Sequence, residues 1–438
     1  MILQKKLIII NIFLFLWIIL GINFGILKNV SFGANLNING NYRLRYEFYD
    51  NYNILNQKYK SQQSFLLSRL RVNFNLSFSK NFSFHFQLQD SEIIDSPVSD
   101  KHYKNKNNPY HDPFDINEFY LKYKVNKNLE IKLGRQHLLF GNKRIFGPGE
   151  WGNTGRYRWD ALRIIYNNKI TKTNFIIGRY IHHNPHIWPN KTYNGVTAIA
   201  LYNKFKFKNT PFEFFWIYKA ETSGKVKGEK KIGNSYTHFI GIRLTGKNNP
   251  WNYDIILVKE LGTYAGDRIS AYGLVFILGY TFLDLPLKPQ LIAQYVVGSG
   301  DKNPEDGKHE TFDAIFSGAD TILYGWMNLC FWRNLREHRV DLVLHPSKKQ
   351  SLRIEYHYFT LDKDKDAWYS PGGIWRRDKT GNAGIELGHE IDFIWKKIFN
   401  KRLNVFIGYS TFIPGKFIKK TGKANNLNYS FLQILFKF

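Results

Sequence analysis

The stretch RLRVNFNLSF, residues 69–78, alternates strictly between polar and apolar side chains. The apolar set is Leu70, Val72, Phe74, Leu76 and Phe78, and the polar set is Arg69, Arg71, Asn73 and Asn75. A period of two puts successive side chains on opposite faces of a β-strand. The stretch therefore predicts a strand with one apolar face and one polar, charged face.

The same alternation recurs along the chain after residue 35, and no sustained helical stripe with caps interrupts it. About eighteen strands are predicted, with boundaries uncertain by a few residues. They lie near 36–49, 64–78, 82–90, 116–125, 129–140, 159–167, 172–181, 196–206, 211–221, 236–246, 251–262, 271–281, 288–299, 336–345, 351–361, 382–396, 403–413 and 426–438.

The breaks between these strands broadly alternate between tight and long. Tight breaks include 79–81, 126–128, 167–169, 247–250 and 346–350, and the long polar breaks are 91–115, 141–158, 182–195, 222–235, 300–335, 362–381 and 414–425. Short turns on one side, long loops on the other and apolar-out, polar-in strands are typical of outer-membrane barrels. The sequence therefore predicts a single transmembrane antiparallel β-barrel with short periplasmic turns and long extracellular loops.

A soluble array of β-sandwiches would also alternate, and it is the competing fold. Of the 438 residues, 17% are aromatic, which a sandwich does not need and two aromatic belts at a membrane do. A barrel of about eighteen strands predicts a water-filled lumen, not a packed core. The long breaks 91–115, 141–158 and 300–335 are expected to fold inward and narrow it. The alternating C-terminus, which ends at Phe438, resembles the assembly signal of bacterial outer-membrane proteins.

Composition excludes several other classes of protein. The single cysteine, Cys330, rules out a disulfide framework within the chain. The aromatic content excludes a disordered or collagen-like chain, and the polar average excludes a polytopic helical membrane protein. The net charge of +27 on its own suggests nucleic acid as a partner, but an export signal argues against that.

The N-terminus has the order of a secretory signal. Lys5 and Lys6 precede an apolar run from Leu7 to Leu20, and small residues follow at Gly33 and Ala34. We predict that residues 1–34 are a cleaved signal peptide and that 35–438 form the barrel. An uncleaved transmembrane anchor is the alternative. The signal places the mature protein in the bacterial envelope, and the barrel places it in the outer membrane.

Strand parity assigns charged side chains to the lumen. The predicted inward bases are Arg43, Arg45, Arg69, Arg71, Lys122, Lys124, Lys132, Arg163, Arg243, Arg339 and Arg353. The predicted inward acids are Glu47, Glu118, Glu130, Glu213, Asp254, Glu260, Asp341, Glu355, Glu386, Glu390 and Asp392. The first third of the wall is thus rich in bases, and the last third is rich in acids.

A cationic wall concentrates anions, and arginine offers bidentate geometry to a carboxylate. Arg43, Arg69 and Arg71 are the leading candidates for contacts with anionic solutes. The competing interpretation is that facing charges only hold one another, because the two sets are equal in number. Much of the net charge comes from lysines in loops, such as Lys225, which would face lipopolysaccharide phosphates.

Arg135 is an exception to the parity pattern, because it shares its face with Ile131 and Leu133. A charge on the lipid face at mid-membrane costs about 2–4 kcal/mol. Either a bulge near Gly134 turns its side chain or Arg135 lies at the outer rim. Together with Arg144 and Arg156 it is predicted to shape the pore mouth, and anchoring of a loop through carbonyl groups is the alternative.

Metal binding and enzyme catalysis, the alternatives to a channel, have weak support in the sequence. His182, His183 and His186 lack a fourth ligand, and Asp362, Asp364 and Asp366 resemble only the start of a calcium loop. No G-x-S-x-G elbow occurs. We therefore expect no enzyme activity and no cofactor. A barrel enzyme of phospholipase or protease type and a non-conducting receptor or adhesin are the alternatives.

Three blocks of residues resemble the alginate export family of outer-membrane porins. They are Leu133–Gln136 with Gly141, Arg144, Gly147, Glu150-Trp151, Asn153–Arg156 and Asp160–Arg163; Gly298–Asp301 with Thr311–Asp313, Tyr324-Gly325 and Asn334-Leu335; and Gly388–Asp392 with Gly408–Ser410, Phe412 and Pro414–Phe417. The resemblance implies an eighteen-stranded porin and leaves the substrate open. We expect passive transport or export of hydrophilic solutes, namely anionic sugars, uronates or small organic acids, with a periplasmic export partner as an open possibility.

Overall fold

The computed structural model describes residues 34–51, 62–94, 99–102, 108–147, 150–155, 158–207, 210–317, 323–370 and 373–438. The predicted signal peptide therefore lies outside the described residues, apart from Ala34. The described elements are almost all strands, and the helices are the short η2 (Asp100–His102) and α2 (Lys416–Thr421). No helix within the described ranges is both long and apolar enough to cross a bilayer.

Eighteen strands form the wall of the molecule. They are β1 (Asn35–Asp50), β2 (Gln62–Ser77), β3 (Phe82–Ile94), β4 (Asp112–Lys124), β5 (Leu129–His137), β7 (Arg158–Asn167), β8 (Thr171–His182), β10 (Val196–Phe205), β11 (Phe212–Lys227), β12 (Ile232–Asn248), β13 (Trp251–Tyr264), β14 (Asp267–Thr281), β15 (Gln290–Gly298), β18 (Leu335–Ser347), β19 (Gln350–Thr360), β22 (Glu386–Ile398), β23 (Leu403–Pro414) and β24 (Leu427–Lys437).

Short strands lie in the connections between the wall strands. They are β6 (Phe146–Gly147), β9 (Lys191–Thr192), β16 (Lys308–His309), β17 (Phe316–Ser317), β20 (Ala367–Ser370) and β21 (Gly373–Arg377). β9 and β16 join the main sheet, β6 pairs with β17, and β20 pairs with β21. These short strands fold the long connections into defined structures.

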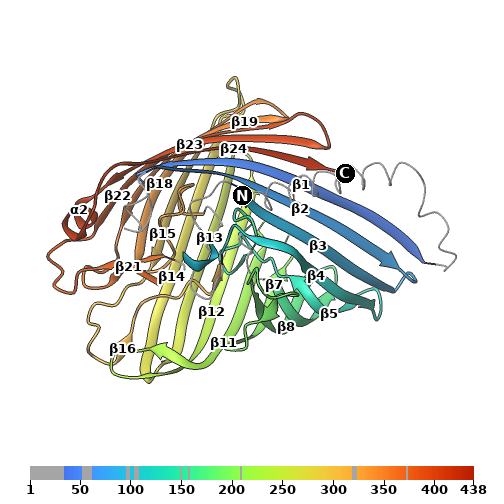
Figure 1. Ribbon diagram of the computed structural model, residues 1–438, viewed down its shortest axis with the longest axis horizontal. Coiled ribbons are helices and arrows are strands. Elements are labelled where there is room, and N and C mark those ends of the chain that lie inside the picture. The colour runs from blue at the N-terminus through green and yellow to red at the C-terminus, as the bar shows by residue number, and fades with distance from the viewer. Residues whose placement is uncertain are drawn as a thin grey trace.

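The wall closes into a barrel. Each wall strand pairs antiparallel with its neighbours in sequence, and β1 also pairs with β24, with Tyr42 opposite Phe436. Figure 1 shows this seam, where the blue first strand runs beside the red last one. Because the sheet has no free edge, the backbone groups of every wall strand are paired within the protein. The predicted barrel of eighteen strands is confirmed, and the sandwich alternative is wrong.

The outer face of the barrel is apolar. On β13, Leu257 is 45% exposed, whereas its neighbours Ile256 and Val258 face inward and are buried. The same pattern leaves Phe276, Ile354 and many other large apolar side chains exposed on the outside. Contiguous apolar surface of this kind is unusual on a soluble monomer and fits contact with lipid.

All the connections at one end are short, and most of those at the other end are long. The longest are 299–334, 361–385 and 138–157. Two predicted breaks are wrong in length: 222–235 is a hairpin whose turn is 228–231, and the break after β13 is only 265–266. In the β11–β12 and β13–β14 hairpins, the strands continue beyond the residues that alternate between apolar and polar. The sequence pattern therefore ends before the strands do.

The interior also differs from the predicted water-filled lumen. The described parts of loops 138–157 and 299–334 fold back into the space that the wall encloses, and Phe146 of β6 pairs with Phe316 of β17. Trp159 packs edge-on against Phe316, with ring centroids 4.7 Å apart, and both side chains are buried. Many of the aromatic residues therefore fill the lumen, in addition to those that cover the outer face.

Candidate functional site: a constricted, charged lumen

Four arginines line the lumen side of two neighbouring strands. Arg43 and Arg45 lie on β1, and Arg69 and Arg71 lie on β2, with Arg43 directly opposite Arg69 in the register. All four are at most 7% exposed. The alternation of β1 and β2, with their register, places these side chains near one another.

The four arginines contact loop 138–157 from the wall. Arg71 Nη1 lies 2.8 Å from Glu150 Oε2, and Arg69 Nη1 lies 3.4 Å from the same oxygen. Arg158, at the start of β7, reaches Glu150 Oε1 at 2.9 Å. Burial raises the pKa of Glu150, but the guanidiniums of Arg71, Arg158 and Arg69 outweigh burial and hold that pKa well below its usual range. Glu150 therefore stays ionised and fixes the loop to the wall.

Positive charge is in excess at this contact. Three guanidiniums share the single carboxylate of Glu150. Arg43 is held only by neutral oxygens, because it donates to the carbonyl groups of Glu150 and Gly152 and to Asn153 Oδ1, at 2.9–3.0 Å. An excess of guanidinium groups in the interior of a barrel attracts anions.

Arg45 plays a different part from its three neighbours. Its Nε pairs with Glu47 Oε1 at 2.5 Å, so its charge is compensated on its own strand. Its guanidinium lies over the ring of Trp151, 4.0 Å from the centroid. Arg45 therefore positions loop 138–157 through a cation–π contact and adds little to the charge excess.

The remaining predicted lumen bases are spread around the wall. Lys132 lies over the ring of Tyr120, Arg163 donates to Asn174 Oδ1, and Arg243 pairs with Asp254 and Glu213. Lys122 lies opposite Lys132 in the register and is partly buried. Of these residues, Arg163 also faces the inner loop, with its guanidinium 5.0 Å from the centroid of Phe140.

The wall strands β18, β19 and β22, toward the C-terminal end of the chain, carry both basic and acidic side chains on the lumen side. Arg339 and Arg353 each contact both Asp341 and Glu355, at 2.5–2.7 Å. These two bases and two acids compensate one another. In this quartet the facing charges hold one another, which is the alternative to solute binding that the sequence left open. Glu390 and Asp392 on β22 lie outside the quartet and are fully buried.

The predicted pore-mouth residues separate in the structure. Arg144 is buried inside the barrel, where it donates to Gln294 Oε1 at 3.1 Å and to the carbonyl of Leu323. It therefore joins the two inner loops to the wall, and its placement at the mouth is corrected. Arg156 lies outside the described residues.

Arg135 is on the outward face, opposite Phe119 and Asp160, next to Gly134 with its φ of 124°. It pairs with Asp160 at 3.0 Å and donates to the carbonyl groups of Ile116 and Asn190. Asn190 belongs to connection 183–195 at the long-loop end. Arg135 is thus at the rim and anchors a loop, which is the alternative that the sequence left open.

The weak metal patterns of the loops do not converge in the described residues. Asp362 pairs with Arg336, whereas Asp366 pairs with Arg377 and accepts from Thr311. His183 pairs with Asp112, and His186 pairs with Asp100. Among the described residues, neither set brings three ligand atoms within 4.8 Å of one another.

A cavity of about 730 Å³ opens among the long loops. Its basic lining residues are Lys227, Arg333, Lys365, Arg377 and Lys379, and its acidic ones are Glu229, Asp301 and Glu305. Tyr264 stacks on His309 at 4.0 Å, and the guanidinium of Arg333 lies over Tyr369. Burial raises the pKa of Asp301 to about 6, so the cavity loses this negative charge below that pH.

Sequence reasoning missed this cavity because its lining comes mainly from three connections without periodicity, together with the ends of β11 and β13. Aromatic rings beside guanidinium groups are suited to a polar ring compound that carries a carboxylate. The only signal in the sequence was the second family-like block, which includes Asp301 and ends just after Arg333.

The comparisons with known proteins agree with this architecture. The family model described as Alginate export matches residues 34–432. Among solved structures, OccK2 (OpdF) of Pseudomonas aeruginosa has a TM-score of 0.61 at 9% identity and covers 92% of this chain and 98% of its own. OpdQ of the same organism has a TM-score of 0.60 at 10% identity and covers 92% and 99%.

A further similar structure is OccK2 (OpdF) in complex with glucuronate, with a TM-score of 0.60 at 10% identity and coverage of 92% and 98%. At these identities the likeness concerns the fold, which is that of outer-membrane porins. No match was found among curated proteins.

Proposed function

Because the chain belongs to the alginate export family, we propose that it is an outer-membrane channel for passive movement of anionic sugars, uronates or small organic acids. Its barrel is that of an outer-membrane porin, which supports a channel and not an enzyme. The observation that carries the choice of anions is the charge excess around Glu150, where three guanidiniums share one carboxylate.

The proposed path begins at the cavity among the long loops, on the extracellular side. There Arg333 and Arg377 offer bidentate donors to a carboxylate, and Tyr264 and Tyr369 offer faces to a sugar ring. The path continues past the inner loops to the arginines of β1 and β2.

The exposed lysines of the β11–β12 hairpin support a contact with lipopolysaccharide. Lys225, Lys227, Lys230 and Lys231 are exposed at the long-loop end of the barrel. In the proposed orientation they face the phosphates of the outer leaflet. A periplasmic export partner would approach the opposite end, where the turns are short.

Single-channel recording with added glucuronate tests the substrate class. Glucuronate added to a channel that conducts chloride is expected to interrupt the current, because its carboxylate binds the arginines while its ring fills the constriction. Glucose at the same concentration has the same ring and no charge, and it is expected to interrupt the current far less. Equal interruption by both sugars, or none by glucuronate, would contradict an anionic sugar as the solute.

A further inference from the structure

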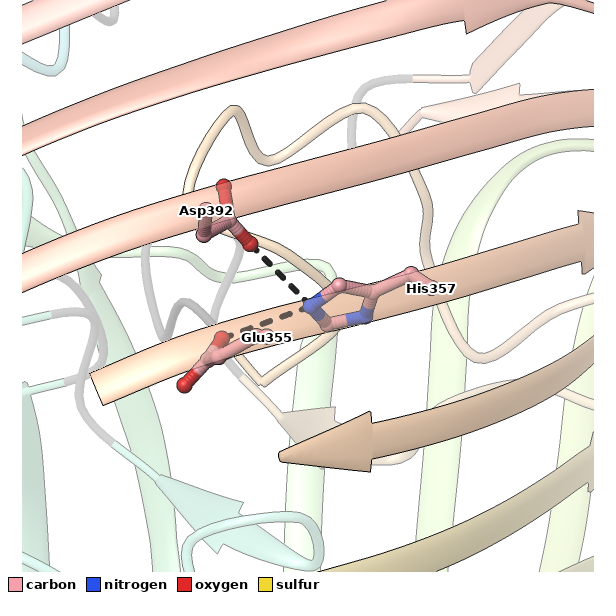
Figure 2. A group of neighbouring side chains, drawn as sticks. All are labelled: Glu355, His357 and Asp392. Atoms are coloured by element: carbon pink, nitrogen blue, oxygen red, sulfur yellow. Dashed lines mark hydrogen bonds and ion pairs between the residues drawn. The ribbon is translucent and has the colours of Figure 1, made fainter. Parts of the chain in front are cut away.

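A second charged cluster lies in the lumen wall, apart from the arginines of β1 and β2. Glu355 and His357 are two residues apart on β19, so both face inward, and Asp392 of β22 is directly opposite Glu355. Figure 2 shows one imidazole nitrogen of His357 between the two carboxylates. His357 Nε2 lies 3.3 Å from Glu355 Oε2 and 3.1 Å from Asp392 Oδ2. The three possible ligand atoms lie within 4.8 Å of one another.

The orientation of His357 is fixed from its other side. Nδ1 lies 2.7 Å from Glu337 Oε1 on β18, and the second oxygen of Glu337 accepts from Gln294 at 2.8 Å. A carboxylate that holds one imidazole nitrogen while the other points at a site is the usual outer shell of a metal-bound histidine. Nδ1 donates to Glu337 and Nε2 faces Glu355 and Asp392, so an ion that displaces the Nε2 proton would meet the nitrogen lone pair between these two carboxylates.

Charge is not balanced in this part of the wall. Arg339 and Arg353 are already paired with Asp341 and Glu355. Glu337, Glu390 and Asp392 therefore face the imidazole of His357 without an ion pair to any lysine or arginine of the described residues. All four of these side chains are 0% exposed. Buried carboxylates without compensation are costly, so the cluster is stabilised either by protonation of a carboxylate or by more positive charge than one imidazole supplies.

Buried oxygens without hydrogen bonds point to the same place. Asp392 Oδ1 and Glu390 Oε2 are buried without a hydrogen-bond partner among the described residues, and Asp392 Oδ2 has only its contact with His357 Nε2. Glu390 Oε1 accepts from the backbone of Met327 at 2.9 Å, which connects the cluster to loop 299–334. Ser410, opposite Asp392 on β23, also has a buried hydroxyl oxygen without a partner. The cluster thus has buried acceptor atoms without hydrogen bonds on three neighbouring side chains, Asp392, Glu390 and Ser410.

We infer that Glu355, His357 and Asp392 bind a divalent first-row transition-metal ion, of the class of Zn²⁺ or Mn²⁺. One imidazole nitrogen with carboxylate oxygens suits these ions, whereas Ca²⁺ and Mg²⁺ prefer oxygen ligands alone. The ion supplies the missing positive charge between β19 and β22. Because Glu390 holds Met327, the ion also stabilises the region of the wall on which loop 299–334 rests. This inference is independent of which solute passes the channel.

Metal binding to the full chain without a histidine tag tests the inference. After treatment with a chelator, the detergent-solubilised protein is titrated with Zn²⁺ or Mn²⁺ by calorimetry. We expect one ion per chain to bind and the temperature of unfolding to rise. Glu337→Gln, which alters only the residue behind His357, is expected to weaken binding by about 10- to 100-fold. His357→Gln and Asp392→Asn are expected to abolish it.

His186→Gln is the matched control, because His186 is exposed and pairs with Asp100 far along the chain. It is expected to leave the affinity unchanged. Pulsed electron paramagnetic resonance of the wild-type protein with Mn²⁺ adds a readout that needs no variant, since a bound imidazole couples its nitrogen to the ion. Absence of that coupling, binding unchanged in His357→Gln, or binding of Ca²⁺ alone would overturn the inference and leave His357 as a charged imidazole among carboxylates.

Discussion

Replacing Glu150 by glutamine is expected to raise single-channel conductance severalfold. The carboxylate of Glu150 joins loop 138–157 to Arg69, Arg71 and Arg158, and glutamine keeps the size of the side chain without its charge. Hydrogen bonds to a charged group contribute about 1.5–3 kcal/mol each. Loss of one such contribution shifts the equilibrium between docked and released loop by about tenfold or more. The released loop widens the lumen, and the freed guanidiniums attract more anions.

The matched control for this variant is Asp284→Asn. Asp284 is exposed in the short connection 282–289, so the change removes one negative charge at the other end of the barrel. Its conductance is expected to stay at the wild-type value. Unchanged conductance in Glu150→Gln would show that this carboxylate does not hold the constriction.

Replacing Arg43 by glutamine is expected to lower the ratio of anion to cation permeability by about fivefold. The guanidinium of Arg43 is held by neutral oxygens, so its removal takes away an uncompensated charge. Two unit charges 4 Å apart interact by about 1 kcal/mol even in bulk water, which corresponds to that factor. The ratio follows from the reversal potential of the variant in a salt gradient.

Arg402→Gln is the control for Arg43→Gln, because Arg402 is an exposed arginine in the short turn 399–402. It removes the same charge outside the lumen and is expected to change the ratio little. Selectivity is the readout because Arg43 also anchors loop 138–157, so its loss changes the conductance for a second reason. An equal drop in both variants would refute the role of Arg43.

The sequence predicted the wall of the barrel well because the wall is periodic. Lipid on one side and charged groups on the other impose a period of two on every strand, so Arg43, Arg69 and Arg71 could be assigned to the lumen from parity alone. The same parity applies to Arg353, Glu355 and His357 on β19. His357 follows Glu355 on this polar face, and a histidine two residues after an inward acid is the sequence signal for the cluster.

The sequence could not predict what fills the lumen. Glu150 meets Arg71 across 79 positions of the chain, and Phe146 meets Phe316 through two loops that have no periodicity. Such contacts depend on the path of a loop, which no local pattern encodes. For the same reason the aromatic content was attributed to membrane belts alone, whereas Trp159 and Trp332 are fully buried inside the barrel.

The reversal potential of the wild-type channel in a planar bilayer tests the central claim most directly. With potassium chloride at about tenfold different concentrations on the two sides, the excess of guanidinium groups in the lumen predicts a reversal potential with the sign set by chloride. A reversal potential with the sign set by potassium would contradict an arginine-lined passage for anions, and so would a value of zero.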